Sequence, residues 1–147
     1  MDIIQKDLRF IDLFTKAAKQ LQARVIISGG YAVDGNLGII TRSHNDMDIQ
    51  IYSKSDGGKT IITTLLQKIY KSHVSVEDKG REEYYHVYRI EKDEFIAEFY
   101  CIQVVSDPFG KEKIVVKRDG SPSEPRKFTS HTVKLDGFTF EAERRPR

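Results

Sequence analysis

The sequence has no tryptophan, one cysteine (Cys101) and no long hydrophobic run. A single cysteine cannot form an intramolecular disulfide, which excludes a disulfide-stabilised fold and suits a reducing compartment. No apolar stretch approaches the roughly 20 residues that a membrane-spanning helix needs. The first ten residues also lack the apolar core of a signal peptide. We therefore expect a soluble protein of the cytoplasm.

The sequence also lacks an excess of either charge, because its 24 basic and 22 acidic residues leave a formal net charge of only +2. Such a balance gives no broad basic surface, so nucleic acid is an unexpected partner. The length of 147 residues suits one domain with a continuous hydrophobic core. Residues 1–147 are therefore expected to form a single domain.

Hydrophobic periodicity predicts helices and strands around one sheet. Apolar residues three and four positions apart predict helices at 6–23, 31–37 and 59–71. Alternating or β-branched runs predict strands at 25–27, 45–52, 74–77, 84–90, 94–105 and 114–116. Asp136-Gly137 is typical of a hairpin turn. This order predicts a mixed α/β or α+β fold, with 107–127 mobile or ligand-facing and a frayed tail at 141–147.

Two acidic residues alternate with apolar ones in the stretch Asn45-Asp46-Met47-Asp48-Ile49. On a strand, Asp46 and Asp48 point to the same face, with Cα atoms roughly 6.5–7 Å apart. Two carboxylates held this way repel each other unless a cation neutralises them. Mg²⁺ is the natural cation, because it binds a few carboxylates together with waters and phosphate oxygens.

A third acid, Glu98, lies in the middle of an otherwise apolar run. Carboxylates in such surroundings usually have a partner. If its strand lies beside that of Asp46 and Asp48, the three acids can bind two metal ions. Metal ions about 3.5–4 Å apart stabilise in-line phosphoryl transfer.

Backbone donors and cations for a phosphate chain stand near the same acids. Gly29-Gly30 follows a predicted strand and precedes a predicted helix, where exposed N–H groups attract anions. Ser28 adds a hydroxyl group, and Arg42 and His44 can contact phosphate oxygens.

Each of these features also has a purely structural interpretation. Asp-x-Asp is common by chance, and Gly-Gly after a strand is ordinary turn chemistry. Arg42 alone reads as a surface cation, and Glu98 could pair with a lysine. Asp34, within the short predicted helix, is expected to be structural or to pair with an arginine.

The whole stretch from Ser28 to Ile51 resembles the signature of small antibiotic nucleotidyltransferases. These are the lincosamide nucleotidyltransferases and 2''-aminoglycoside adenylyltransferases of the polymerase-β-like superfamily. The matching positions are Gly29-Gly30-Tyr31 with Asp34, Leu37-Gly38, Thr41-Arg42, and His44 with Asp46 and Asp48. Tyr31 replaces the usual Trp. The chain ends at Arg147 without the extra helical region of the larger aminoglycoside enzymes, so the short lincosamide type is the expected analogue.

The resemblance implies a nucleotidyltransferase fold, with a central mixed, mostly antiparallel sheet packed by helices. By the same resemblance Ser28, Gly29 and Gly30 hold a triphosphate that Arg42 supports. Asp46 and Asp48 bind Mg²⁺, and Glu98 shares the metal and acts as the base.

We therefore expect AMP transfer from ATP to a hydroxyl of a small acceptor, of lincosamide or aminoglycoside type, with release of pyrophosphate and a role in antibiotic resistance. The acceptor is expected near 107–127 and the aromatic residues Tyr84, Tyr85, His86 and Tyr100, which could equally pack in the core. Two alternatives stay open: a non-catalytic or toxin-type nucleotide-binding module, and a metal-dependent nuclease. A homodimer that closes the acceptor side is a further hypothesis.

Overall fold

The computed structural model describes residues 2–144, as three helices and nine strands. The helices are α1 (Ile3–Gln20), α2 (Gly29–Leu37) and α3 (Gly58–Tyr70). The strands are β1 (Arg24–Ser28), β2 (Met47–Ser53), β3 (Glu77–Arg81), β4 (His86–Lys92), β5 (Phe95–Gln103), β6 (Glu112–Lys113), β7 (Arg126–Lys127), β8 (Ser130–Leu135) and β9 (Phe138–Glu143). None of the described helices is both long and apolar enough to cross a membrane.

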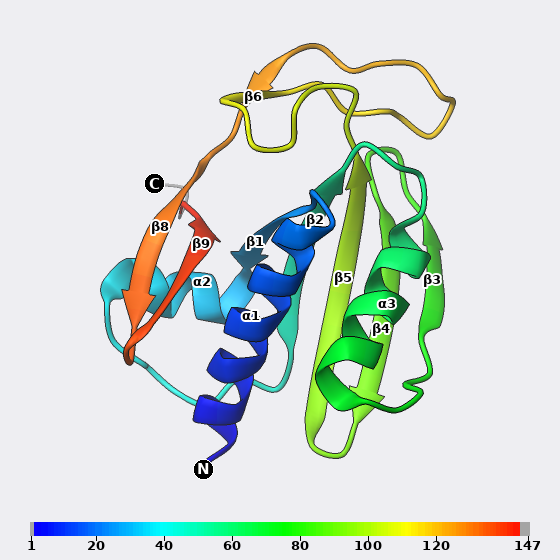
Figure 1. Ribbon diagram of the computed structural model, residues 1–147. Coiled ribbons are helices and arrows are strands. Elements are labelled where there is room, and N and C mark those ends of the chain that lie inside the picture. Colours follow the sequence, from blue (N-terminus) through cyan, green and yellow to red (C-terminus); the bar gives the residue numbers. More distant parts are fainter. Residues whose placement is uncertain (1, 145–147) are drawn as a thin grey trace.

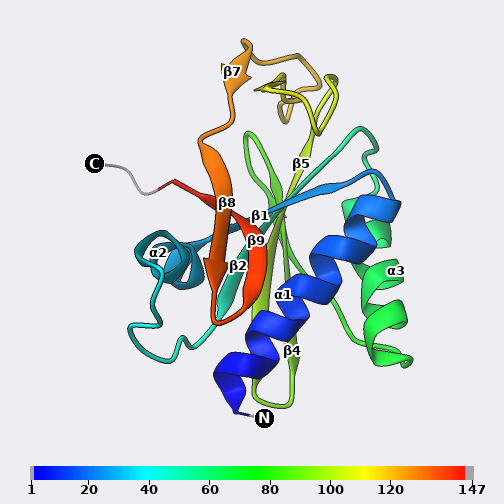
Figure 2. The same ribbon diagram turned by 60° about the vertical axis from the view of Figure 1, so that its left-hand side comes forward.

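Seven strands form one twisted sheet in the order β3-β4-β5-β2-β1-β9-β8 (Figure 1). Two neighbouring pairs, β2 with β5 and β1 with β9, are parallel, and the other four are antiparallel. The expected mixed, mostly antiparallel sheet packed by helices is therefore confirmed. The segment between β5 and β8 contains a separate two-stranded sheet, β6 with β7, and lies beyond one end of the large sheet (Figure 2).

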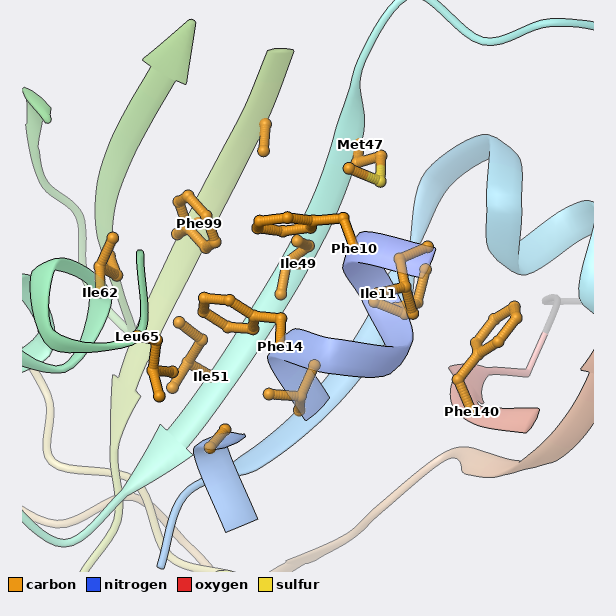
Figure 3. Close-up of a cluster of buried hydrophobic side chains, with 14 of the residues drawn as sticks. Phe10, Ile11, Phe14, Met47, Ile49, Ile51, Ile62, Leu65, Phe99 and Phe140 are labelled. Carbon is orange, nitrogen blue, oxygen red and sulfur yellow. The ribbon is translucent and has the colours of Figure 1, made fainter. Parts of the chain in front are cut away.

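Helices α1 and α3 lie side by side against one face of the sheet (Figures 1 and 2). Every second residue of β2, from Met47 to Ile51, points into this core. The ring of Phe14 on α1 lies 5.2 Å from the ring of Phe99 on β5, and Figure 3 shows these side chains between the helices and the sheet. The alternation in the sequence therefore separates a helix-covered face from a second face.

The second face of the sheet has a polar end and an apolar end. At the start of β2 and β5, it presents Asp48 and Glu98, which are neighbours in register. At the other end it presents a small apolar cluster, made of Ile26, Tyr52, Ile102, Val104 and Val115. Val115 comes from the segment between β5 and β8, which thus covers part of this face. The two acids and the apolar cluster therefore lie on the same face of the sheet.

Most of the predicted elements are present, with three differences. β3 begins at Glu77 rather than at Val74, because its pairing with β4 begins only there, where Glu77 is opposite Arg89. The run 114–116 makes only isolated bridges, and the regular pairing lies at 112–113. The tail predicted to fray from 141 is a strand to Glu143, because Ala142 is fully buried and Glu141 pairs with Arg24. Residues 145–147 of that tail lie outside the described residues.

Candidate active site

Strand register brings two of the three predicted acids together. Asp48 on β2 is paired with Glu98 on β5, and with Ser28 on β1 from the other side. Asp46 lies two residues earlier, is exposed, and just precedes the strand. The acid-bearing strands are therefore neighbours, as a shared site for these acids requires, and all three acids lie near one end of the sheet.

The electrostatics of Asp48 are those of an acid that lacks a counter-charge. Burial raises the pKa of Asp48 above its usual value, and the like charges of Asp46 and Glu98 raise it further. The hydroxyl of Tyr100 donates a hydrogen bond to Asp48 Oδ1 over 3.3 Å and opposes this shift. A cation bound between these acids would lower the same pKa.

Glu98 has a basic neighbour on the next strand. Arg89 on β4 is directly opposite Glu98, and its Nη1 lies 3.5 Å from Glu98 Oε1. Cross-strand pairs of opposite charge stabilise a sheet modestly. The structural interpretation of Glu98 suggested a lysine as its partner, whereas the observed partner is an arginine. The sequence does not show which residue lies opposite another in the sheet.

The donor chemistry of this end of the sheet fits Mg²⁺. Carboxylate oxygens are the ligands that Mg²⁺ takes from proteins, usually one or two of them, and its remaining positions go to water and phosphate. Within residues 2–144, no three Asp, Glu, His or Cys side chains converge closely enough to enclose a metal ion. The arrangement therefore suits an open site completed by a phosphate rather than a closed protein cage.

Gly29 allows the start of α2 to approach Asp48 closely. A Cβ atom at Gly29 would lie 2.4 Å from Asp48 Oδ2, and its φ of +68° is one that other residues rarely adopt. Ser28 is the N-cap of α2, and its side chain makes no capping bond, donating instead to the carbonyl of Asp48 over 3.4 Å. The unpaired N–H groups of the first helical turn thus lie beside the carboxylate, where an anion can bind.

Gly30 makes room for a buried histidine. A Cβ atom at Gly30 would lie 2.2 Å from His44 Nδ1. His44 Nε2 lies 2.7 Å from Asp34 Oδ2, and Asp34 also accepts a 2.6 Å hydrogen bond from Thr41. Burial acts to raise the pKa of Asp34, but the bonds from Thr41 and His44 outweigh it and lower the pKa. Asp34 thus anchors both ends of the stretch 41–44, which leads directly to Asp46.

Two residues predicted to contact phosphate, Arg42 and His44, have protein groups as their neighbours in this structure. Arg42 is exposed, and its Nη1 donates only to the carbonyl of Ser43 over 3.3 Å. The His44 side chain is 6% exposed and faces Asp34. The expected structural role of Asp34 is therefore present, with His44 and Thr41 as partners in place of an arginine. A contact between His44 and a nucleotide stays a prediction.

The Tyr31 hydroxyl is the partner of a buried acid, Asp7 on α1, over 2.5 Å. Burial raises the pKa of Asp7, and this hydrogen bond opposes the rise. We expect Tyr31→Phe to lower the free energy of unfolding by about 2 kcal/mol at pH 7, since it leaves a buried carboxylate unpaired. The loss should shrink as the pH falls toward the raised pKa, because a protonated Asp7 costs less to bury.

Urea unfolding of the Tyr31→Phe variant at pH 7 and pH 5 measures this effect. Tyr84→Phe is the matched control, because Tyr84 is 39% exposed and removal of its hydroxyl should cost little. Equal losses for Tyr31→Phe at both pH values would contradict the role given to Asp7.

A pocket of about 380 Å³ adjoins the acids on the same face of the sheet. Its lining includes Ser28 and Tyr100 near the acids, and Tyr84 and Tyr85 from the loop before β4. The predicted fourth lining residue, His86, lies elsewhere: its Nε2 is 2.6 Å from Asp78 Oδ1, and its ring stacks on Tyr88. The remaining lining residues are Ile26, Gln50, Tyr52, Ile102, Lys113, Val115, Ser123, Arg126, Phe128, Thr129, Ser130 and Glu143.

A chain of hydrogen bonds crosses this pocket, and the sequence did not predict it. Lys113 Nζ donates to the Tyr52 hydroxyl over 3.3 Å, and that hydroxyl donates to Gln50 Oε1 over 2.6 Å. Gln50 Nε2 then donates to Glu143 Oε2 over 2.9 Å. The four residues come from β2, β6 and β9. The only sequence signal was the alternation of β2, which places Gln50 and Tyr52 on the face of Asp48.

Known proteins resemble this chain in sequence family and in fold. The family model of the aminoglycoside-2''-adenylyltransferases matches residues 11–139. A search of curated proteins finds no significant match.

Two solved structures are similar over nearly the whole chain. The crystal structure of ANT(2'')-Ia with adenylyl-2''-tobramycin is 15% identical with a TM-score of 0.60, over 95% of this chain and 70% of that one. The lincomycin-bound lincosamide antibiotic adenylyltransferase LnuA is 12% identical with a TM-score of 0.63, over 92% of this chain and 79% of that one.

Proposed function

Because the chain belongs to the aminoglycoside-2''-adenylyltransferase family and has the nucleotidyltransferase fold, we propose that it is a nucleotidyltransferase. It transfers AMP from ATP to a hydroxyl group of a small acceptor, of antibiotic type, and releases pyrophosphate. The observation that supports this most directly is the register of Asp48 with Glu98 and Ser28, beside the start of α2.

In this proposal the triphosphate lies at the start of α2. The N–H groups after Ser28 bind phosphate oxygens, and Gly29, which has no Cβ to clash with Asp48, lets the start of α2 lie beside that carboxylate. Arg42, exposed in the loop that leads to Asp46, binds the departing pyrophosphate. One or two of the acids Asp46, Asp48 and Glu98 would hold each Mg²⁺, which supplies charge neutralisation at the phosphate oxygens.

The acceptor hydroxyl lies between Glu98 and the α-phosphorus in the proposed reaction. Its oxygen attacks the α-phosphorus, the bond from that phosphorus to the bridging oxygen of the β-phosphate breaks, and pyrophosphate leaves with the bond electrons. Glu98 takes the hydroxyl proton, as a positioned base can. Arg89 and Tyr100 hold the neighbouring carboxylates in place, through their contacts with Glu98 and Asp48.

The body of the acceptor occupies the 380 Å³ pocket. This volume is within the range of pockets that hold small molecules. Tyr85 and Tyr100 meet edge to face, with ring centroids 5.4 Å apart, and give the pocket an aromatic wall close to the acids. The cytoplasmic location and the homodimer expected from the sequence are retained as proposals.

A screen with ATP, Mg²⁺ and a pyrophosphate readout tests the proposed function. The panel comprises lincosamides, aminoglycosides and cellular hydroxyl compounds, including acidic ones. We expect pyrophosphate release that depends on one acceptor class and on Mg²⁺. Binding of ATP and Mg²⁺ without release across the panel would favour the nucleotide-binding module instead, and cleavage of RNA or DNA would favour the nuclease.

A further inference from the structure

The charges that line the acceptor pocket do not suit a polycation. Lys113 and Arg126 face the pocket, and within residues 2–144 neither forms an ion pair. Glu143 is the one acid of the lining, and it already accepts a hydrogen bond from Gln50. A polycationic acceptor would therefore meet two cations and a single acid in the pocket, apart from the acids at its metal end.

Lys113 is held in a place that is costly for an unpaired cation. Its ammonium group lies over the rings of Tyr52 and Phe128, 5.1 and 5.2 Å from their centroids, and the ring faces attract it. Within residues 2–144, however, its one hydrogen bond goes to the neutral Tyr52 hydroxyl, and it has no carboxylate partner. Burial lowers the pKa of Lys113, and repulsion from Arg126 and Arg24 lowers it too, although Glu143 acts in the opposite direction. An anion beside Lys113 would relieve both penalties.

Arg24 adds a third positive charge near Lys113. Its guanidinium stacks on the Phe128 ring at 3.9 Å and binds Glu141 and the carbonyl groups of Pro108 and Gly110. Arg24 is therefore satisfied by the protein, whereas in the described part of the chain Lys113 and Arg126 keep donors that a ligand can use. We call these two residues the cationic corner.

The cationic corner lies away from the end of the pocket that adjoins the acids. It is therefore separate from the proposed triphosphate site. Tyr52, which Lys113 contacts, is four residues from Asp48 on β2, so their Cα atoms are roughly 13 Å apart. The start of α2 lies at the Asp48 end of the pocket. A ligand whose hydroxyl group reaches the acids can therefore place its far end against Lys113.

We propose that the acceptor carries an anionic group, such as a carboxylate, which the cationic corner binds while its ring body lies against the aromatic walls. This inference rests on the proposed function for the identity of the ligand as an acceptor. It assigns the pocket to acidic, ring-containing hydroxyl compounds and against polycationic ones. Lys113 is the specificity-determining residue, with Arg126 as a second donor.

Three glucosides of matched shape test the charge preference. Phenyl β-glucoside is neutral, its 4-carboxyphenyl analogue is anionic, and its 4-aminomethylphenyl analogue is cationic. Calorimetry without nucleotide should show the anionic probe binding roughly tenfold more tightly than the neutral one, the factor expected for one charge-assisted hydrogen bond, and the cationic probe binding most weakly.

The variant Lys113→Met should abolish this preference, and Lys113→Glu should reverse it in favour of the cationic probe. Lys134→Met is the control, because Lys134 is exposed on β8 outside the pocket and its loss should leave the preference intact. Thermal unfolding of each variant near the wild-type Tm shows that the pocket is still folded. Equal affinity for the three probes, no binding of any probe, or an unchanged preference in Lys113→Met overturns the proposal.

ATP binding separates the two possible sources of the anion. If the corner binds the acceptor, Lys113→Met leaves the calorimetric affinity for Mg²⁺ and ATP unchanged within twofold. A tenfold loss of ATP affinity would assign the corner to the nucleotide and overturn the proposal. A wild-type protein that prefers the anionic probe but transfers no AMP to any acceptor would keep the anion site and remove the proposed function, so the two failures are distinguishable.

Discussion

Replacing Asp48 with asparagine is expected to reduce nucleotidyl transfer by on the order of 10³-fold while raising the stability of the ligand-free protein. The loss of activity follows because Asn lacks the charge that would hold Mg²⁺ beside the α-phosphate, an electrostatic contribution of this size in comparable sites. Asp48 is also the acid in register with Glu98.

The gain in stability follows from the sign of the pKa shift. Burial, together with Asp46 and Glu98, raises the pKa of Asp48 in the folded state. The unfolded chain therefore ionises this group more readily, and the charge lowers the stability of the folded state at neutral pH. This penalty disappears as the pH falls through the raised pKa, and it disappears at every pH in Asp48→Asn. We expect a rise in Tm on the order of 2 °C.

Thermal unfolding with and without Mg²⁺ and ATP measures the gain in stability and the loss of Mg²⁺ binding in one experiment. Ligands that bind only the folded state raise Tm, so Mg²⁺ with ATP should stabilise the wild type more than Asp48→Asn. Asp12→Asn is the control, because Asp12 lies on α1 and pairs with the exposed Lys16. An Asp48→Asn variant that is stabilised by Mg²⁺ as strongly as the wild type would contradict the metal assignment.

Gly30→Ala is expected to lower the free energy of unfolding by about 2–5 kcal/mol, because overpacking and a buried carboxylate left without its hydrogen bond each cost roughly 1–3 kcal/mol. The added methyl would lie 2.2 Å from His44 Nδ1, and His44 cannot move aside without losing the fully buried Asp34. Displacement of His44 also shifts the loop that carries Arg42 and Asp46. Transfer activity should therefore fall even at temperatures where the variant is folded.

A double-mutant cycle identifies His44 as the cause. If the clash is with His44, the variant Gly30→Ala combined with His44→Ala should lose less stability than the sum of the two single variants. Gly57→Ala is the matched control, because a Cβ at Gly57 meets nothing closer than 3.8 Å. Additive losses in the cycle would show that Gly30 is required for some other reason.

The local pattern of the sequence was enough to predict those parts of the sheet that depend on residues close together in the chain. Alternation in β2 gave the two faces, and Asp136-Gly137 gave the hairpin that joins β8 to β9, with both residues at positive φ. The parallel pairing of β9 with β1 could not be predicted, because the two strands are separated by most of the chain. Contacts such as Arg24 with Glu141 depend on that pairing.

The candidate site, too, could be predicted only in part from the sequence. Asp46, Asp48 and Glu98 followed from residue type, spacing and resemblance, and the register of β2 with β5 places the last two side by side. The bond from His44 to Asp34 was missed, since ten residues of helix and loop separate the partners. Lys113 was missed for a similar reason: it lies in a short strand after a loop, and only the tertiary fold brings it to Tyr52.

The central claim is that the α-phosphate, and not the γ-phosphate, passes to an acceptor. The most direct measurement incubates the wild-type protein, Mg²⁺ and the acceptor panel with ATP labelled at either position, and follows the label by chromatography and mass spectrometry. We predict that the α-label appears in an adenylylated acceptor while the γ-label appears in pyrophosphate. Appearance of the γ-label in the acceptor, or of no labelled acceptor from the panel despite bound ATP, would contradict nucleotidyl transfer.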